Sequence, residues 1–176
     1  DVATSKVDLS GAISFLDDGP SITKATPTVA SLQVDDSDLS TNASLALSTI
    51  FTELKGGADG LASTSYSLSV DNTKSSGLLD TATGDPVQVE VISGVVHGYV
   101  VINNVHTDVF TVSLTDDGKV MLDQLRAVVQ TNHSSNNEAT AALASGLISL
   151  TATVTDGDQD VATSKVDLSG AISFLD

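Results

Sequence analysis

Cysteine and tryptophan are absent from the chain, and only seven of its 176 residues are lysine or arginine. Without cysteine there are no disulfide bonds, so a protein of this kind that works outside the cell needs another cross-link, and a metal ion is the usual substitute. Aromatic residues make up only 3% of the chain, while hydrophobic residues make up 40%. Valine, alanine, leucine, isoleucine, serine and threonine dominate instead, which favours a thin-cored β structure over a helix bundle.

Positive charge is scarce: seven basic residues face 23 acidic ones, and the formal net charge is −16. We expect no nucleic acid and no anionic membrane as a partner, because both repel such a chain. The excess also destabilises the compact state by self-repulsion unless bound cations relieve it, although a solvated surface is the alternative interpretation. No apolar run is long enough to cross a membrane, so we expect no membrane insertion.

The same seventeen residues, DVATSKVDLSGAISFLD, occupy positions 1–17 and 160–176. Chance does not produce an identical match of this length, so the chain carries a tandem repeat with a period of 159 residues. The four residues at 17–20 combine two acids, a glycine and a proline, which indicates a linker. We therefore expect residues 1–17 to be the C-terminal tail of a preceding repeat and residues 18–176 to be one full repeat.

Short alternating segments separated by turn residues run through most of the chain. We expect an edge strand interrupted by Pro27 within 21–32. We expect one short helix or helical turn within 41–55, where apolar residues approach helical spacing and glycines follow. The remaining segments predict strands at 64–70, 87–91, 95–102, 109–114 and 120–125, turns at 71–77, 103–104 and 115–119, and a polar loop at 130–140.

The last part of the chain predicts a β-hairpin with an acidic tip. Apolar residues alternate with polar ones from Ile148 to Val154, residues 156–160 form a turn, and the alternation resumes from Ala162 to Leu168. Seven to nine short strands at this spacing predict an all-β fold, an antiparallel Ig-like β-sandwich with one short helix. Such domains can be strung end to end, because their termini can lie at opposite poles.

The strongest candidate for chemistry is the acidic tip of this hairpin. Asp156, Asp158 and Asp160 alternate around a glycine, a pattern similar to half of a calcium-binding loop. Ca²⁺ takes six to eight oxygen ligands, and three carboxylates with nearby carbonyl groups supply many of them. The pattern departs from an EF-hand, because no glutamate occupies the twelfth position and no flanking helices are expected. A solvated Asp/Gly turn is the alternative.

Two further groups of aspartates are candidate Ca²⁺ ligands. Asp35, Asp36 and Asp38 lie in one acidic loop, for which an Asx-turn or a helix N-cap is the alternative explanation. Asp17 and Asp18 lie in the linker, where they could join a neighbouring loop in a site that bridges two repeats.

Other polar residues give no pattern that predicts a site. Asp116 and Asp117 precede a glycine and indicate a plain hairpin turn. His97, His106 and His133 lack zinc-binding spacing, and we expect His97 to be a packed or edge residue. The sequence has no nucleophile elbow, phosphate loop or Rossmann glycine pattern. We therefore expect a protein that is not an enzyme.

Several of these stretches together resemble a known family. LTATVTDGDQD at 150–160, FTVSL at 110–114 with VMLDQLR at 120–126, SYSLSV at 65–70 and the linker at 17–20 occur in the order found in the long tandem repeats of giant bacterial adhesins. These are RTX adhesins of the RtxA type, which are exported by type I secretion. The nonapeptide GGxGxDxUx calcium repeat is absent here, so a calcium site depends on the aspartate clusters alone.

The resemblance implies an extracellular extender repeat on the bacterial cell surface, a spacer that Ca²⁺ stiffens and that supports adhesion or biofilm formation. It implies neighbouring repeats of the same chain as partners, and we expect a monomer. A ligand-binding module for sugar or host protein is the alternative, although few aromatic residues are present to line a sugar site.

The duplicated segment carries its own prediction. Residues 1–17 and 160–176 are identical, so either segment could in principle occupy the same position in the sheet. We expect the C-terminal copy to occupy it, because a tight turn joins that copy to its partner strand and closing a short loop costs little entropy.

Overall fold

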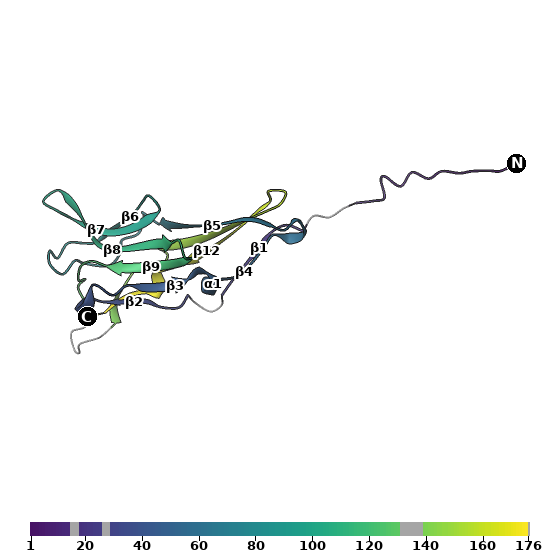
Figure 1. Ribbon diagram of the computed structural model, residues 1–176. Coiled ribbons are helices and arrows are strands. Elements are labelled where there is room, and N and C mark those ends of the chain that lie inside the picture. Colours follow the sequence, from purple (N-terminus) through teal and green to yellow (C-terminus); the bar gives the residue numbers. More distant parts are fainter. Residues whose placement is uncertain (15–17, 26–28, 131–138, 176) are drawn as a thin grey trace.

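The computed structural model describes residues 1–14, 18–25, 29–130 and 139–175. The described chain is built mostly of β-strands arranged as a sandwich, and a few short helical turns lie between strands (Figure 1). The fold class predicted from the sequence is therefore confirmed. No helix in the described ranges has the length and apolarity that a membrane crossing requires.

One layer is a five-stranded antiparallel sheet with the order β3-β9-β8-β7-β6. Its long central strands follow the alternation of the sequence, so that Val96, Val100 and Val112 point into the core while their neighbours stay partly exposed. The strands are β3 (Ala43–Ala46), β6 (Gln88–Ile92), β7 (Val95–Ile102), β8 (Val105–Thr115) and β9 (Lys119–Gln124).

The other layer is made of shorter sheets with the orders β5-β11-β12, β2-β13-β10 and β1-β4. The rings of Phe110 on β8 and Phe174 on β13 lie 5.3 Å apart between their centroids, which joins the two layers through the core. The strands of this layer are β1 (Ser21–Lys24), β2 (Leu32–Asp35), β4 (Phe51–Lys55), β5 (Leu61–Val70), β10 (Ala139–Ala142), β11 (Ile148–Asp156), β12 (Val161–Asp167) and β13 (Ile172–Leu175).

The closing hairpin forms as its sequence predicts. Strand β11 buries Leu150, Ala152 and Val154 on one face and pairs in antiparallel register with β12 and β5. One face of β11 packs on the core and the other is mostly half-buried, which accounts for its alternation.

The short helix or helical turn expected within 41–55 is present as one turn, α1 (Leu47–Ile50). It is no longer than this because β3 before it pairs with β9 and β4 after it pairs with β1. Serine, threonine and isoleucine in this stretch have low helix propensity, so strand pairing prevails. The single edge strand expected at 21–32 is wrong in detail, because β1 ends at Lys24 and β2 begins only at Leu32.

The sandwich also departs from purely antiparallel pairing and from the expected strand count. Strand β13 pairs with β2 in parallel register, from Ile172 opposite Leu32 to Leu175 opposite Asp35. The described residues form thirteen strands rather than seven to nine. The additional strands are mostly four or five residues long, too short for an alternating pattern to be recognised in the sequence.

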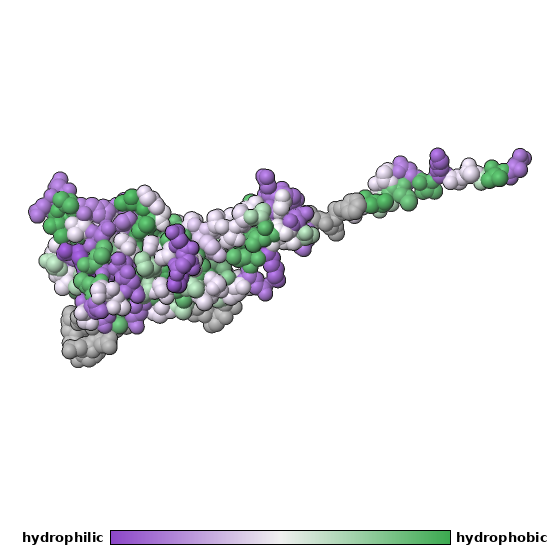
Figure 2. Space-filling model, in the orientation of Figure 1, coloured by the Kyte–Doolittle hydropathy of each residue, from purple (hydrophilic) through white to green (hydrophobic). Residues whose placement is uncertain are grey.

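The C-terminal copy of the duplicated segment is the one that joins the sandwich. It forms β12, the 3₁₀ turn η3 (Ser169–Ala171) and β13. Residues 1–14 form no strand and extend away from the sandwich (Figure 1). Figure 2 shows hydrophobic side chains spaced along this extension, where Val2 is 92% exposed and Ile13 is 60% exposed.

Candidate metal centre

The tip of the β11–β12 hairpin places one carboxyl group inside the protein. Asp156 follows Val154 on the buried face of β11 and has no exposed surface. The turn folds back over it, since the Asp160 backbone N–H donates to Asp156 Oδ1 at 2.7 Å. In the backbone, the Asp156 N–H donates to the Asp160 carbonyl oxygen at 3.1 Å. The strand alternation therefore continues through the last residue of β11 and buries an ionisable group.

Three carboxyl groups converge at this tip. One potential ligand oxygen from each of Asp156, Asp158 and Asp160 lies within 4.8 Å of the others. The second oxygen of Asp156, Oδ2, is buried and has no hydrogen-bond partner among the described residues. Burial raises the pKa of Asp156, and the nearby Asp158 raises it further. A buried carboxylate oxygen without a partner is rare in folded proteins, and a bound cation would satisfy it.

The linker and the loop before β5 pack against the hairpin tip. The loop contains the 3₁₀ turn η2 (Gly57–Asp59), and a side chain at Gly157 would lie 2.5 Å from the Asp59 carbonyl oxygen. The Ala58 backbone N–H donates to the carbonyl oxygen of Asp18 at 3.3 Å. A side chain at Gly19 would approach Asp160 Oδ2 to 3.9 Å. The Asp59 carbonyl oxygen therefore lies beside the acidic tip, and oxygen is the atom that Ca²⁺ prefers.

The second aspartate group predicted from the sequence has a capping geometry. Asp35 is the N-cap of the 3₁₀ turn η1 (Asp36–Asp38) and accepts from the Ser37 N–H at 2.9 Å. Asp38 accepts from the Ser40 N–H at 3.0 Å and from the Thr41 hydroxyl at 2.7 Å. The Ser40 hydroxyl also donates to Asp38, and this side-chain hydrogen bond is the main cause of the lowered pKa of Asp38. The loop does not bring three potential ligand oxygens together as the hairpin tip does.

The remaining candidate aspartates divide between the linker and a turn. Asp17 lies outside the described residues, whereas Asp18 lies next to η2. Asp117 forms the expected hairpin turn, where it accepts from Thr115 Oγ1 at 2.5 Å and pairs with the Lys119 ammonium group at 2.6 Å.

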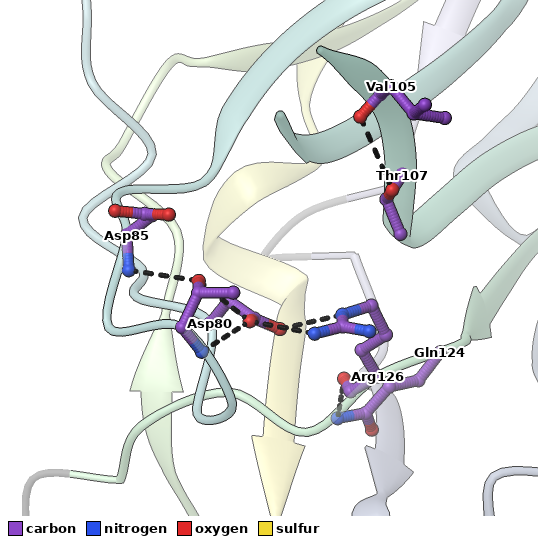
Figure 3. Close-up of polar contacts among 7 residues, drawn as sticks. Asp80, Asp85, Val105, Thr107, Gln124 and Arg126 are labelled. Atoms are coloured by element: carbon purple, nitrogen blue, oxygen red, sulfur yellow. Dashed lines mark hydrogen bonds and ion pairs between the residues drawn. The ribbon is translucent and has the colours of Figure 1, made fainter. Parts of the chain in front are cut away.

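Asp80 is a second fully buried carboxylate, and both of its oxygens have partners. Arg126 donates through Nε to Oδ1 at 2.8 Å and through Nη2 to Oδ2 at 2.9 Å (Figure 3). Thr83 also donates to Oδ2. The hydrogen bond from Arg126 is the main cause of the lowered pKa of Asp80. Arg126 and Thr83 satisfy Asp80 without a metal, so burial alone does not mark a metal site. The unpartnered oxygen is what distinguishes Asp156 as a candidate ligand.

The structure brings together a further group of potential ligands that the sequence did not predict. His97, His106 and Asp108 each offer one ligand atom within 4.8 Å of the others. The signal was the pair Asn103-Asn104, which forms a two-residue hairpin turn with φ angles of +51° and +63°. Pairing the strands outward from this turn places the three residues on one face of the sheet.

The sequence comparison identifies a family. A family described as "Domain of unknown function (DUF5801)" matches residues 31–169. The chain belongs to this family. The DUF5801 match covers the hairpin tip and the histidine group, while the linker lies outside it. No curated protein and no solved structure matches the chain.

Proposed function

We propose that this DUF5801 chain is an extender repeat of a bacterial cell-surface adhesin and that Ca²⁺ stabilises its folded state outside the cell. The observation that carries the calcium part is the buried, unpartnered Oδ2 of Asp156 between the carboxyl groups of Asp158 and Asp160. An identical segment repeated after 159 residues supports a tandem array. The resemblance to repeats of RTX adhesins supports the link to adhesion and biofilm formation.

The position of the acidic tip supports a role at the junction between repeats. The tip, η2 and the linker residue Asp18 meet at one end of the sandwich, and the C-terminus lies at the opposite end (Figure 1). A cation held there would join the linker to two loops of the following repeat. Neighbouring repeats are therefore the proposed partners, and a stiffer junction is the proposed result.

Ca²⁺ binding would also make folding depend on the compartment. An ion that binds the folded state alone stabilises it by about 2.7 kcal/mol at a hundredfold excess over its dissociation constant. This is a large share of the roughly 5–15 kcal/mol that stabilises a typical domain. Low cytosolic Ca²⁺ would leave the acidic tip repelling itself and keep the chain suited to export in an unfolded form. Higher Ca²⁺ outside the cell would then complete the fold.

Thermal unfolding tests this proposal. The melting temperature should rise by about 5–10 °C when EDTA is replaced by millimolar Ca²⁺, and Mg²⁺ should have much less effect. The variant Asp156→Asn keeps the oxygen that accepts from the Asp160 N–H but removes the buried charge. It should lose the Ca²⁺ response without losing stability in EDTA.

The matched control is Asp116→Asn, which removes one acid from a hairpin turn and should keep the full response. An unchanged melt of the original chain in Ca²⁺ would remove calcium from the proposal. A response that survives Asp156→Asn would place the ion elsewhere.

A ligand-binding module of the same adhesin is the second candidate function. One observation favours it: a groove lined by Phe51, Tyr66 and Leu54 lies beside α1. A glycan array and a host-cell binding assay on the isolated chain test it. Binding that is lost in Tyr66→Ala would support this candidate, whereas absence of binding would leave the spacer role.

A further inference from the structure

Three neighbouring strands place two histidines and two carboxylates on the outer face of the five-stranded sheet. His97 on β7 pairs with Glu90 on β6, and Asp108 on β8 pairs with Tyr99 on β7. His106 lies two residues before Asp108, so its side chain points to the same face. The alternate residues of β7, such as Val96 and Val100, point into the core. The sheet geometry therefore groups these polar side chains on the side away from the core.

Asp108 lies between the two imidazole rings. Its Oδ2 is 2.9 Å from His97 Nδ1, and its Oδ1 is 3.0 Å from His106 Nε2. The two rings are perpendicular to each other, with 6.2 Å between their centroids. Two nitrogens and one oxygen thus converge from two adjacent strands, and all three potential ligand atoms lie within 4.8 Å of one another.

Two further residues hold His106 in this orientation. Glu90 Oε1 lies 3.4 Å from His106 Nδ1, the ring nitrogen that faces away from Asp108. The ring of Tyr99 stacks on His106 with 3.7 Å between centroids and 22° between planes. Histidines that bind metals commonly donate their other ring N–H to a carboxylate, which fixes the tautomer and the ring orientation. Glu90 is the carboxylate placed to accept from His106 Nδ1.

We propose that His97, His106 and Asp108 bind a divalent transition-metal ion, with Zn²⁺ as the ion that this ligand set fits best, and that Glu90 positions His106. Two imidazoles and one carboxylate suit Zn²⁺, which commonly takes three protein ligands and leaves its fourth position to water. The side chains of His97, Asp108 and His106 are 22%, 28% and 36% exposed, so an ion can enter from solvent. Ca²⁺ prefers oxygen ligands alone, so this site differs in chemistry from the acidic hairpin tip.

Calorimetric titration with Zn²⁺ tests the site. The chain is used without a histidine tag, stripped of metal, and held in excess Ca²⁺ so that oxygen-only sites do not compete. One Zn²⁺ ion should bind per chain, and the melting temperature should rise on binding because the ion joins β7 to β8. Co²⁺ in place of Zn²⁺ should give the visible absorption of a low-symmetry site with nitrogen ligands.

Substitutions identify the ligands. His97→Gln and His106→Gln should each weaken Zn²⁺ binding at least tenfold, and Glu90→Gln should weaken it about tenfold if it orients His106. His133→Gln and Asp158→Asn are matched controls, because they remove the third histidine and an acid of the hairpin tip. Both controls should bind Zn²⁺ as the original chain does, and circular dichroism should show every variant folded.

Three results would overturn this inference: no saturable Zn²⁺ binding, binding that persists in the double variant His97→Gln/His106→Gln, or binding that disappears in His133→Gln. In the first case the cluster is a polar network in which Asp108 only accepts hydrogen bonds from histidine. None of these three results bears on the proposed Ca²⁺ site, which has its own variants.

Discussion

Asp80 and Asp156 are both fully buried, and they differ in the hydrogen-bond partners of their carboxylate oxygens. Arg126 and Thr83 satisfy both oxygens of Asp80, whereas Asp156 Oδ2 has no partner among the described residues. An uncompensated buried charge is costly, so a chain that retains it has a use for it. At the residue scale, this contrast separates a structural carboxylate from a candidate ligand.

The stability contributed by Asp80 should depend on pH. Its pKa is lowered from the ordinary value of 3.8, mainly by the hydrogen bond from Arg126, so the folded state binds the Asp80 proton less tightly than the unfolded state. Its stabilising effect is therefore complete above pH 3.8 and is lost as the pH falls through the lower, folded-state pKa. At neutral pH the melting temperature of the original chain should be higher than that of Asp80→Asn. The difference between the two melting temperatures should narrow below pH 3.8. A difference in melting temperature that stays constant below pH 3.8 would show that the charge of Asp80 does not contribute to stability.

Gly98 should be intolerant of any side chain. A Cβ atom there would collide with the ring of Phe110, which lies across Gly98 on the neighbouring strand and packs on Phe174. Because Phe110 is fully buried, the ring has no space into which to move. Gly98→Ala should lower the free energy of unfolding by about 1–3 kcal/mol in urea denaturation. Gly170→Ala is the control, since open space surrounds that position, and an equal loss in both variants would refute the explanation.

The residues of the hairpin tip could be found from the sequence because they are local. Asp156, Asp158 and Asp160 lie in one turn, and the alternation of β11 indicates which of them faces inward. Asp80 could not be found, because its partner Arg126 is 46 residues away and neither residue belongs to a pattern. The histidine group is an intermediate case. The Asn103-Asn104 turn sets the pairing of His106 and Asp108 with β7, whereas His97 lies beyond a register shift between Gly98 and Tyr99.

At the scale of elements, the long strands could be predicted, whereas most of the four- and five-residue strands could not. Strands β5, β7, β8 and β11 contain eight or more residues, enough for alternation to be visible. Strands β3 and β4 flank a single helical turn, and long-range pairing with β9 and β1 decides their conformation. Such pairing overrides local preference, which is why the helical segment within 41–55 is limited to one turn.

The Asp80–Arg126 pair should be the most consequential ion pair among those described. It joins the segment before β6 to the residues after β9, where Asp80 and Val128 also form a bridge. Arg126→Ala should lower the free energy of unfolding by about 3 kcal/mol, near the low end for buried pairs because Arg126 stays 26% exposed. Lys55→Ala breaks an exposed pair with Glu53 and should cost about 0.5 kcal/mol. If chemical denaturation gave the same loss of unfolding free energy for Arg126→Ala and Lys55→Ala, the burial of Asp80 would not strengthen its ion pair.

At the scale of the whole molecule, the folded unit should not depend on its N-terminal extension. Residues 1–14 are exposed and outside every sheet, while the identical C-terminal copy supplies β12 and β13. Deleting residues 1–14 should change the free energy of unfolding by less than about 0.5 kcal/mol. Deleting residues 161–175 should prevent folding, and circular dichroism with thermal melting compares the two. Marked destabilisation by the first deletion would mean that the N-terminal copy does contribute to the sheet.

The opposite placement of the two ends determines how the sandwich responds to tension. The chain enters at β1 beside the hairpin tip and leaves after β13 at the far end (Figure 1). A pull between these points runs along the axes of both strands, and β13 is hydrogen-bonded to a neighbour on each side, β10 and β2. Its hydrogen bonds are therefore loaded in shear and must break together, whereas a pull across the strands would unzip them one at a time. A chain of such units would transmit force from end to end and yield only when a whole strand slides free.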